Sequence, residues 1–282
     1  SDGKPDLVGT WNYAHRPGDP WSGPVYFPRV GRPEEFTFGE MVRLPGFPAT
    51  VYAALAMADI DADGLPDVVR TTRGGDAVEF HLNTGSPTDT GIPTFALNAT
   101  TGLQGGDWTP VRVVDLDGDG AWDLTLGKWR TYSEGSDTDT LGEGAKGTIY
   151  IRNTNAYGWP FSAGDAVFLG TVGVGTDFLD IDADGHLDAV SLVPDPSDPG
   201  LSGFRVGWQK NLGGTPPEFG PVELLEEVNA RVRRPREVVA VRTPSRSGLL
   251  VTADDFQKVV FFELHKPVPG SARFSVFGTA GS

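Results

Sequence analysis

The stretch Asp115–Gly127, DLDGDGAWDLTLG, places four aspartates in nine residues and continues directly into an apolar run. Four carboxylates this close together repel one another, and each is better solvated in water. The pattern recurs as DIDADGLPDVV from Asp59 and as DIDADGHLDAV from Asp180. We therefore expect a bound positive charge to hold each cluster together.

In each cluster, aspartates stand at positions one, three, five and nine, and glycine stands at position six. Glycine accepts the backbone angles of a sharp turn, so the first three aspartates can point inward together while the last one closes a cage. Charged oxygen ligands suit a hard cation, and Ca²⁺ tolerates irregular geometry better than Mg²⁺. The sequence thus predicts three calcium sites, with a backbone carbonyl from position seven as a further ligand in each. The predicted ligands are Asp59, Asp61, Asp63, Leu65 and Asp67; Asp115, Asp117, Asp119, Ala121 and Asp123; and Asp180, Asp182, Asp184, His186 and Asp188.

Two other interpretations of these loops are less favoured. An EF-hand needs a bidentate Glu at position twelve and helices on both sides, but position twelve is Arg70, Leu126 or Ser191 and the flanks alternate as strands do. Plain acidic turns are common, yet three copies in register with the same apolar flanks argue against them. We expect the ions to be structural, because a catalytic ion needs an open coordination position and partner residues.

The three clusters also mark an internal repeat. Their fifth positions are separated by 56 and 65 residues. A partial copy with Asp2, Gly3 and Asp6 opens the chain, and Val238–Asp255 repeats the apolar flanks without the aspartates, so we expect no metal in that last copy. The repeats therefore start near residues 1, 59, 115, 180 and 241, within a single domain that covers 1–282.

Each repeat has the pattern of four β-strands. One strand enters the acidic loop, a second leaves it, a third often ends in Asn, and a fourth contains Phe and often Gly. Glycine (38 residues) and proline (23 residues) are frequent, and no long segment has the apolar period of a helix. Four antiparallel strands make one propeller blade, and a blade covers its faces only by stacking against its neighbours. The sequence predicts an all-β fold, a β-propeller with about five four-stranded antiparallel blades in this chain.

The acidic loops, the alternating strands and the Phe-Gly elements resemble the FG-GAP/VCBS repeat family, which includes the propellers of integrin α-subunits and several lectins. The resemblance covers nearly the whole chain, and D-x-D-x-D-G-x-x-D is its most specific part. It implies a calcium-stabilised module that binds glycans or proteins. Loop sites on extracellular modules bind calcium at ~10⁻⁴–10⁻³ M, which extracellular calcium can fill. We therefore expect an extracellular, cell-surface or periplasmic protein.

A ligand is expected on the propeller rim opposite the calcium loops, where the connections vary most in length. These connections carry aromatic side chains, which stack on sugar rings, and arginines, which bind carboxylate or sulfate groups. For any single residue, packing between blades is the alternative role. The residues expected on this ligand rim are Trp11, Tyr13, Arg16, Trp21, Arg70, Trp108, Trp129, Arg130, Tyr132, Arg233 and Arg234.

Two further functions stay open beside the binding module. Some lyases that cleave acidic polysaccharides use propeller scaffolds, and Tyr13, His15 and Arg16 could supply the base and the group that neutralises the uronate. This short motif is weak, so catalysis is less favoured than binding. The third possibility is a structural module within a larger extracellular protein.

Charge and composition exclude other classes. The net charge is −15, and three divalent ions would bring it only to −9, which argues against a nucleic-acid partner. The chain has no cysteine and no apolar run of about 18 residues, so disulfides and membrane insertion are not expected. Because the first repeat lacks its entering strand, we expect a fragment, truncated at the N-terminus, of a six- or seven-bladed ring, or an additional chain or segment that completes the first blade.

Overall fold

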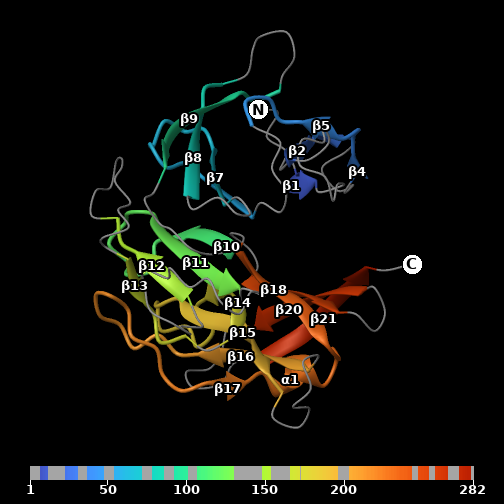
Figure 1. Ribbon diagram of the computed structural model, residues 1–282. Coiled ribbons are helices and arrows are strands. Elements are labelled where there is room, and N and C mark those ends of the chain that lie inside the picture. The colour runs from blue at the N-terminus through green and yellow to red at the C-terminus, as the bar shows by residue number, and fades with distance from the viewer. Residues whose placement is uncertain are drawn as a thin grey trace, which may run out of the picture. The chain divides into compact units, whose positions relative to one another are not determined.

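The computed structural model describes residues 7–11, 23–30, 37–47, 54–71, 78–85, 92–100, 107–129, 148–153, 166–171, 173–195, 203–242, 247–253, 258–265 and 273–280. These residues form β-strands, turns and one short helix, α1 (Glu226–Asn229) (Figure 1). In this described part of the chain, no helix is long and apolar enough to span a bilayer.

The strands form antiparallel sheets whose members follow one another in sequence. The first sheet contains β1 (Leu7–Trp11), β2 (Gly23–Phe27) and β5 (Val42–Arg43), and β3 (Arg29–Val30) pairs with β4 (Thr37–Phe38). The second contains β6 (Leu55–Ala58), β7 (Asp67–Thr71), β8 (Val78–Asn83) and β9 (Phe95–Thr100). The third contains β10 (Asp107–Val114), β11 (Asp123–Trp129), β12 (Thr148–Ile151) and β13 (Ala166–Phe168). The fourth contains β14 (Val174–Leu179), β15 (Asp188–Pro194), β16 (Phe204–Gln209) and β17 (Glu223–Leu224). The fifth contains β18 (Pro235–Arg242), β19 (Ser247–Ala253), β20 (Lys258–His265) and β21 (Arg273–Ala280).

This arrangement is that of β-propeller blades. Four sheets have four strands in sequence order, and the first has three described strands of the same kind. The predicted fold class, an all-β propeller with about five blades in this chain, is confirmed. A ring of six or seven blades stays a prediction.

In the second and fourth sheets, the second strand is the most buried one. Every residue of β7 is buried, whereas most residues of β9, the fourth strand of the same sheet, are exposed. β15 is likewise buried except at its last residue, Pro194. Because an inner strand is covered on both faces, it reads in the sequence as a continuous apolar run that follows the acidic loop.

The chain forms two compact units, and the second begins at Val114, the last residue of β10. In the first unit, Leu44 and Phe47, which follow β5, pack against Val68 and Phe95 of the second sheet. In the second unit, Tyr150 of the third sheet packs with Phe178 of the fourth. The fourth and fifth sheets share a larger core. Neighbouring blades within a unit are thus joined by apolar side chains, as propeller stacking requires.

Candidate metal centres

Each acidic loop joins the first strand of a sheet to the second strand. We call residues 59–67, between β6 and β7, the first cage, residues 115–123, between β10 and β11, the second cage, and residues 180–188, between β14 and β15, the third cage. In each cage, carboxylate oxygens from positions one, three and nine lie within 4.8 Å of one another. Three converging oxygens at this separation can coordinate one cation.

The aspartate at position nine fixes the loop to the third strand of its sheet. In the third cage, Oδ2 of Asp188 accepts the N–H of Ile181 at 2.8 Å, and Oδ1 accepts the N–H of Asn211 at 2.9 Å. Asp188 is fully buried. The same pair of bonds is made by Asp67 with Ile60 and Asn83, and by Asp123 with Leu116 and Asn153. This side chain is therefore a structural cross-link as well as a candidate ligand.

The glycine at position six has the backbone conformation that the sequence predicts. Its φ is 88° at Gly64, 90° at Gly120 and 94° at Gly185. In each cage its N–H donates to Oδ2 of the aspartate at position one, at 3.0 to 3.2 Å. The turn thus brings the first carboxylate back over the loop. Position four also needs a positive φ, which the sequence analysis missed because two cages have Ala62 and Ala183 there.

The aspartate at position five lies differently from the other three. Asp63, Asp119 and Asp184 are absent from the groups of converging oxygens. Each instead accepts the N–H of the residue at position seven through Oδ1, at 2.7 to 2.9 Å. Their role as ligands, and that of the carbonyls of Leu65, Ala121 and His186, stays a prediction.

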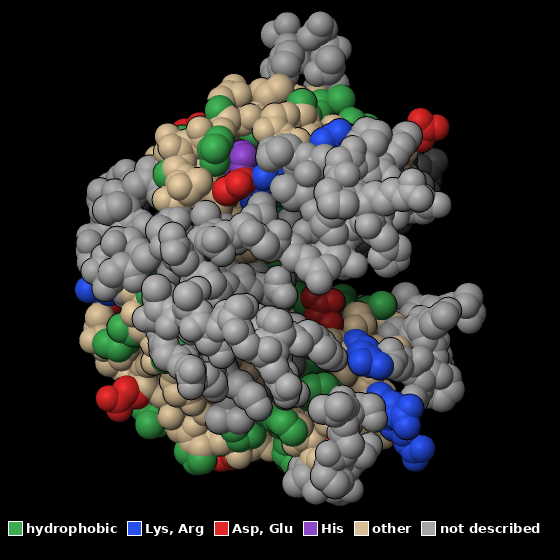
Figure 2. Space-filling view, in the orientation of Figure 1, with side chains coloured by type: hydrophobic (Ala, Val, Ile, Leu, Met, Phe, Trp, Pro, Cys, Tyr) green, Lys and Arg blue, Asp and Glu red, His purple; other side chains and the backbone are tan. Residues whose placement is uncertain are grey.

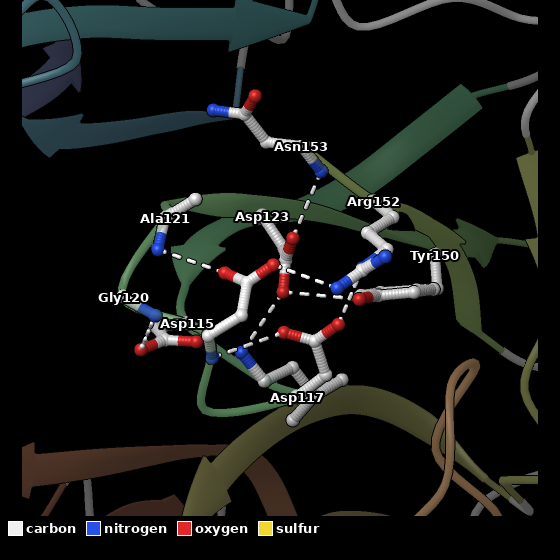
Figure 3. Close-up of polar contacts among 10 residues, drawn as sticks. Asp115, Asp117, Gly120, Ala121, Asp123, Tyr150, Arg152 and Asn153 are labelled. Carbon is white, nitrogen blue, oxygen red and sulfur yellow. Dashed lines mark hydrogen bonds and ion pairs between the residues drawn. The ribbon is translucent and has the colours of Figure 1, made fainter. Parts of the chain in front are cut away.

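A basic side chain just after the third strand also contacts two of the cages. In the second cage, Arg152 lies against the carboxylates of Asp117 and Asp119, and the Tyr150 hydroxyl donates to Oδ2 of Asp123 at 3.1 Å (Figure 3). In the third cage, Lys210 bonds Asp182 and Asp184. Arg152 and Lys210 were not among the residues predicted for the site, although each directly precedes the asparagine that follows a third strand.

Each cage also holds a carboxylate oxygen that lacks a donor. Oδ1 of Asp59, Oδ1 of Asp115 and Oδ1 of Asp182 are buried and accept no hydrogen bond. A buried carboxylate oxygen without a partner is unfavourable, so a cation at this point would stabilise the folded loop. The donor set, which consists of oxygens from several carboxylates, fits a hard divalent ion such as Ca²⁺.

Burial perturbs the carboxyl at position nine. It raises the pKa of Asp123 to about 6 and that of Asp188 to about 6, and the backbone N–H donors offset this only in part. The pKa of Asp67 is raised as well, for the same reason. A bound cation would remove this penalty, because it favours the ionised form.

These shifts predict an unusual pH dependence for the metal-free protein. A carboxyl with a folded-state pKa near 6 stabilises the fold while protonated, so this stabilisation is present below about pH 4 and is lost as the pH rises through about 6. The loss amounts to roughly 3 kcal/mol for Asp123 and for Asp188. Thermal unfolding of chelator-treated protein should therefore give a lower Tm at about pH 7.5 than at about pH 5. With calcium this difference should shrink or reverse, and a higher Tm of the metal-free protein at the higher pH would contradict the assignment.

The structure corrects one residue of the expected ligand rim. Arg70 is fully buried, its guanidinium bonds Glu79 at 2.6 to 2.7 Å, and it stacks over the ring of Phe47 at 5.3 Å. The prediction of an exposed rim position was wrong because Arg70 lies within the buried second strand β7, where a paired arginine can substitute for an apolar residue.

The other expected rim residues divide into three groups. Arg233 and Arg234 are exposed and follow α1. Strands β1, β10 and β11 contain Trp11, Trp108 and Trp129, whose side chains are not described. Outside the described residues lie Tyr13, His15, Arg16, Trp21, Arg130 and Tyr132, which include all three candidate lyase residues.

Comparison with known families agrees with the loops and the blades. Residues 59–125, which run from the first cage through the second sheet to the second cage, match the family model described as FG-GAP-like repeat. The chain contains an FG-GAP-like repeat. The predicted resemblance to the FG-GAP family is confirmed, and the loop geometry of this repeat recurs in the third cage. Neither a curated protein nor a solved structure matches the chain significantly. The repeat match and the propeller fold support an interaction or structural module, and the three acidic clusters could hold metal ions.

Proposed function

We propose that the protein is a calcium-stabilised binding module that acts outside the cell and recognises an acidic saccharide unit of a glycan. The observation that supports calcium most directly is the buried, unpartnered carboxylate oxygen present in each of the three cages. Calcium bound there would neutralise repelling charges and hold the first and second strands of each blade together. Sites of this kind bind calcium at ~10⁻⁴–10⁻³ M, which favours an extracellular setting.

A basic pocket in the second unit supports an acidic ligand. The open pocket, of about 400 Å³, lies where β15 ends and β16 begins, beside the segment that follows α1. It is therefore at the end of β15 opposite the third cage. Its lining includes Phe204, one acidic residue, Asp195, and three arginines, Arg205, Arg233 and Arg234. Figure 2 shows a group of Lys and Arg side chains at the lower right of the drawn face.

The arginines of this pocket differ in whether they form ion pairs within the protein. Arg205 bonds Glu226 at 2.6 Å, and Glu226 is 68% exposed. Arg233 and Arg234 form no ion pair with another described residue. Unpaired guanidinium groups on a protein of net charge −15 are available to an external carboxylate or sulfate.

The backbone at Arg234 is a further sign of a specialised site. Its φ is 50°, a left-handed conformation that costs a residue with a side chain about 1 kcal/mol. Strained residues of this kind gather at binding sites. The pocket volume matches one or two sugar rings, and Phe204 offers an apolar face for stacking. These features favour an acidic saccharide over an acidic protein partner.

The test is binding of uronate-containing and sulfated oligosaccharides in the presence of calcium. Replacing Arg233 and Arg234 together by Ser should weaken binding by roughly tenfold or more, because each charge-assisted hydrogen bond is lost. Arg242→Ser removes an exposed arginine at the other end of the fifth sheet and should change nothing. Binding that is insensitive to the double substitution, or that is restricted to acidic proteins, would refute this ligand assignment. Release of unsaturated sugar products would instead indicate a lyase.

A further inference from the structure

The three cages share their aspartates but differ in the residue that precedes the asparagine of the third strand. That residue is Leu82 beside the first cage, Arg152 beside the second and Lys210 beside the third. The bond between the aspartate at position nine and the asparagine N–H holds this end of the third strand against the loop. The preceding side chain is therefore placed next to the carboxylates.

Arg152 forms two ion pairs with the second cage. Its Nε lies 2.5 Å from Oδ2 of Asp117, and Nη2 lies 2.8 Å from Oδ2 of Asp119. The Asp117 side chain is only 1% exposed, so this pair is poorly solvated on one side. Asp117 also belongs to the group of converging oxygens that would hold the ion.

Lys210 has the same place in the third cage. Its ammonium group bonds the carboxylate of Asp182, which belongs to the converging group, and lies 2.8 Å from Oδ2 of Asp184. The first cage differs, because no described lysine or arginine contacts Asp59, Asp61 or Asp63 and the corresponding residue, Leu82, is apolar. Within the described part of the chain, two of the three similar cages thus contact a lysine or an arginine.

A tethered cation and a metal ion compete for the same oxygens. Each cage carries four carboxylates, and in the second and third cages Arg152 or Lys210 neutralises one of these charges before any ion binds. An incoming divalent ion must displace the side chain or sit beside a like charge. The planar guanidinium of Arg152 holds two carboxylates in a fixed geometry, whereas the ammonium of Lys210 is a point charge on a flexible stem. Lys210 should therefore be displaced more easily.

We propose that Arg152 and Lys210 are built-in counter-ions that weaken divalent-cation binding, so that calcium fills the first cage first, the third next and the second last. This inference rests on the proposed function, because it takes the cages to be calcium sites. It also means that the first cage depends most on the ion, while the other two loops keep a counter-charge without it.

Calorimetric titration of the full chain with calcium tests this order. Unmodified protein should show one tight step and two steps roughly tenfold weaker, with the third cage binding more tightly than the second, which is the size expected when two partly exposed ion pairs compete with the metal. Asp61→Asn should remove the tight step. Arg152→Leu and Lys210→Leu should each strengthen one weak step by about tenfold, and Leu82→Lys should weaken the tight step by a similar factor. The matched control, Arg231→Leu, removes an exposed arginine that follows α1, away from the cages, and should leave all steps unchanged.

The outcomes separate this inference from the proposed function. Three binding steps of equal affinity would refute the role of Arg152 and Lys210 as counter-ions but would leave calcium binding supported. The same conclusion would follow if Arg152→Leu and Lys210→Leu left the affinities unchanged. The absence of calcium binding in every variant would overturn both. Hydrogen exchange of the unmodified protein gives an independent test that needs no substitution. In chelator, amides of residues 59–67 should lose protection while those of 115–123 and 180–188 keep it, and equal loss in all three loops would refute the order.

Discussion

Replacing Asp188 by Ala is expected to lower the free energy of unfolding by about 4 kcal/mol, even in the absence of calcium. The substitution removes the acceptor of two buried backbone N–H groups, those of Ile181 and Asn211. Each buried donor left without an acceptor costs about 1–3 kcal/mol. The third strand also loses its cross-link to the acidic loop, so the effect should exceed that of an average substitution.

Asp184→Ala is the matched control, because it removes a carboxylate from the same loop. Asp184 is 30% exposed and accepts the exposed N–H of His186. Its loss should cost the metal-free protein about 1 kcal/mol or less. Urea unfolding of both variants in chelator gives the comparison. Equal destabilisation would mean that the aspartate at position nine has no special structural role.

Chelation of calcium is expected to produce the largest change in stability. If the first cage binds with a dissociation constant of ~10⁻⁴ M and the other two bind about tenfold more weakly, then about 10 mM calcium stabilises the fold by about 2.7 kcal/mol at the first cage and by about 1.4 kcal/mol at each of the others. Three cages together would then contribute about 5.5 kcal/mol. Urea unfolding at fixed pH, with calcium and with chelator, measures this difference. Magnesium is the control, and it should stabilise less because it tolerates the irregular loop geometry poorly.

If a variant with altered cages is no longer stabilised by calcium, the stabilisation arises from calcium bound in the cages. The variant combines Asp61→Asn, Asp117→Asn and Asp182→Asn, and it alters one converging carboxylate in each cage. Its stability should depend little on calcium. If calcium still stabilised this variant by several kcal/mol, the ion would bind elsewhere.

Repetition made the fold predictable from sequence. One acidic loop would have been ambiguous, but three in register fixed the position of the first and second strands in three sheets, and these strands lie where the loops predict them. The converging oxygens at positions one, three and nine follow from the same spacing. The fifth sheet could be placed because its apolar runs survive without the aspartates.

Contacts between distant segments could not be predicted in the same way. The asparagine near the end of each third strand could be recognised in the sequence. Its hydrogen bond to the aspartate at position nine could not, because it joins residues such as Asn153 and Asp123 that are 30 positions apart. The ion pairs of Arg152 depend on that placement. Burial of Arg70 could not be predicted, because a buried, paired arginine looks the same in sequence as an exposed one. Arg205 joins the basic pocket only because β16 begins beside the segment after α1.

Crystals grown with calcium, measured for anomalous scattering, test the central claim most directly. We predict an anomalous peak in each of the three cages, bounded by carboxylate oxygens from positions one, three and nine. No peak is expected in the connection between β18 and β19, which lacks the aspartates. Cages without density at a saturating calcium concentration, with Arg152 and Lys210 still paired to their aspartates, would contradict the account.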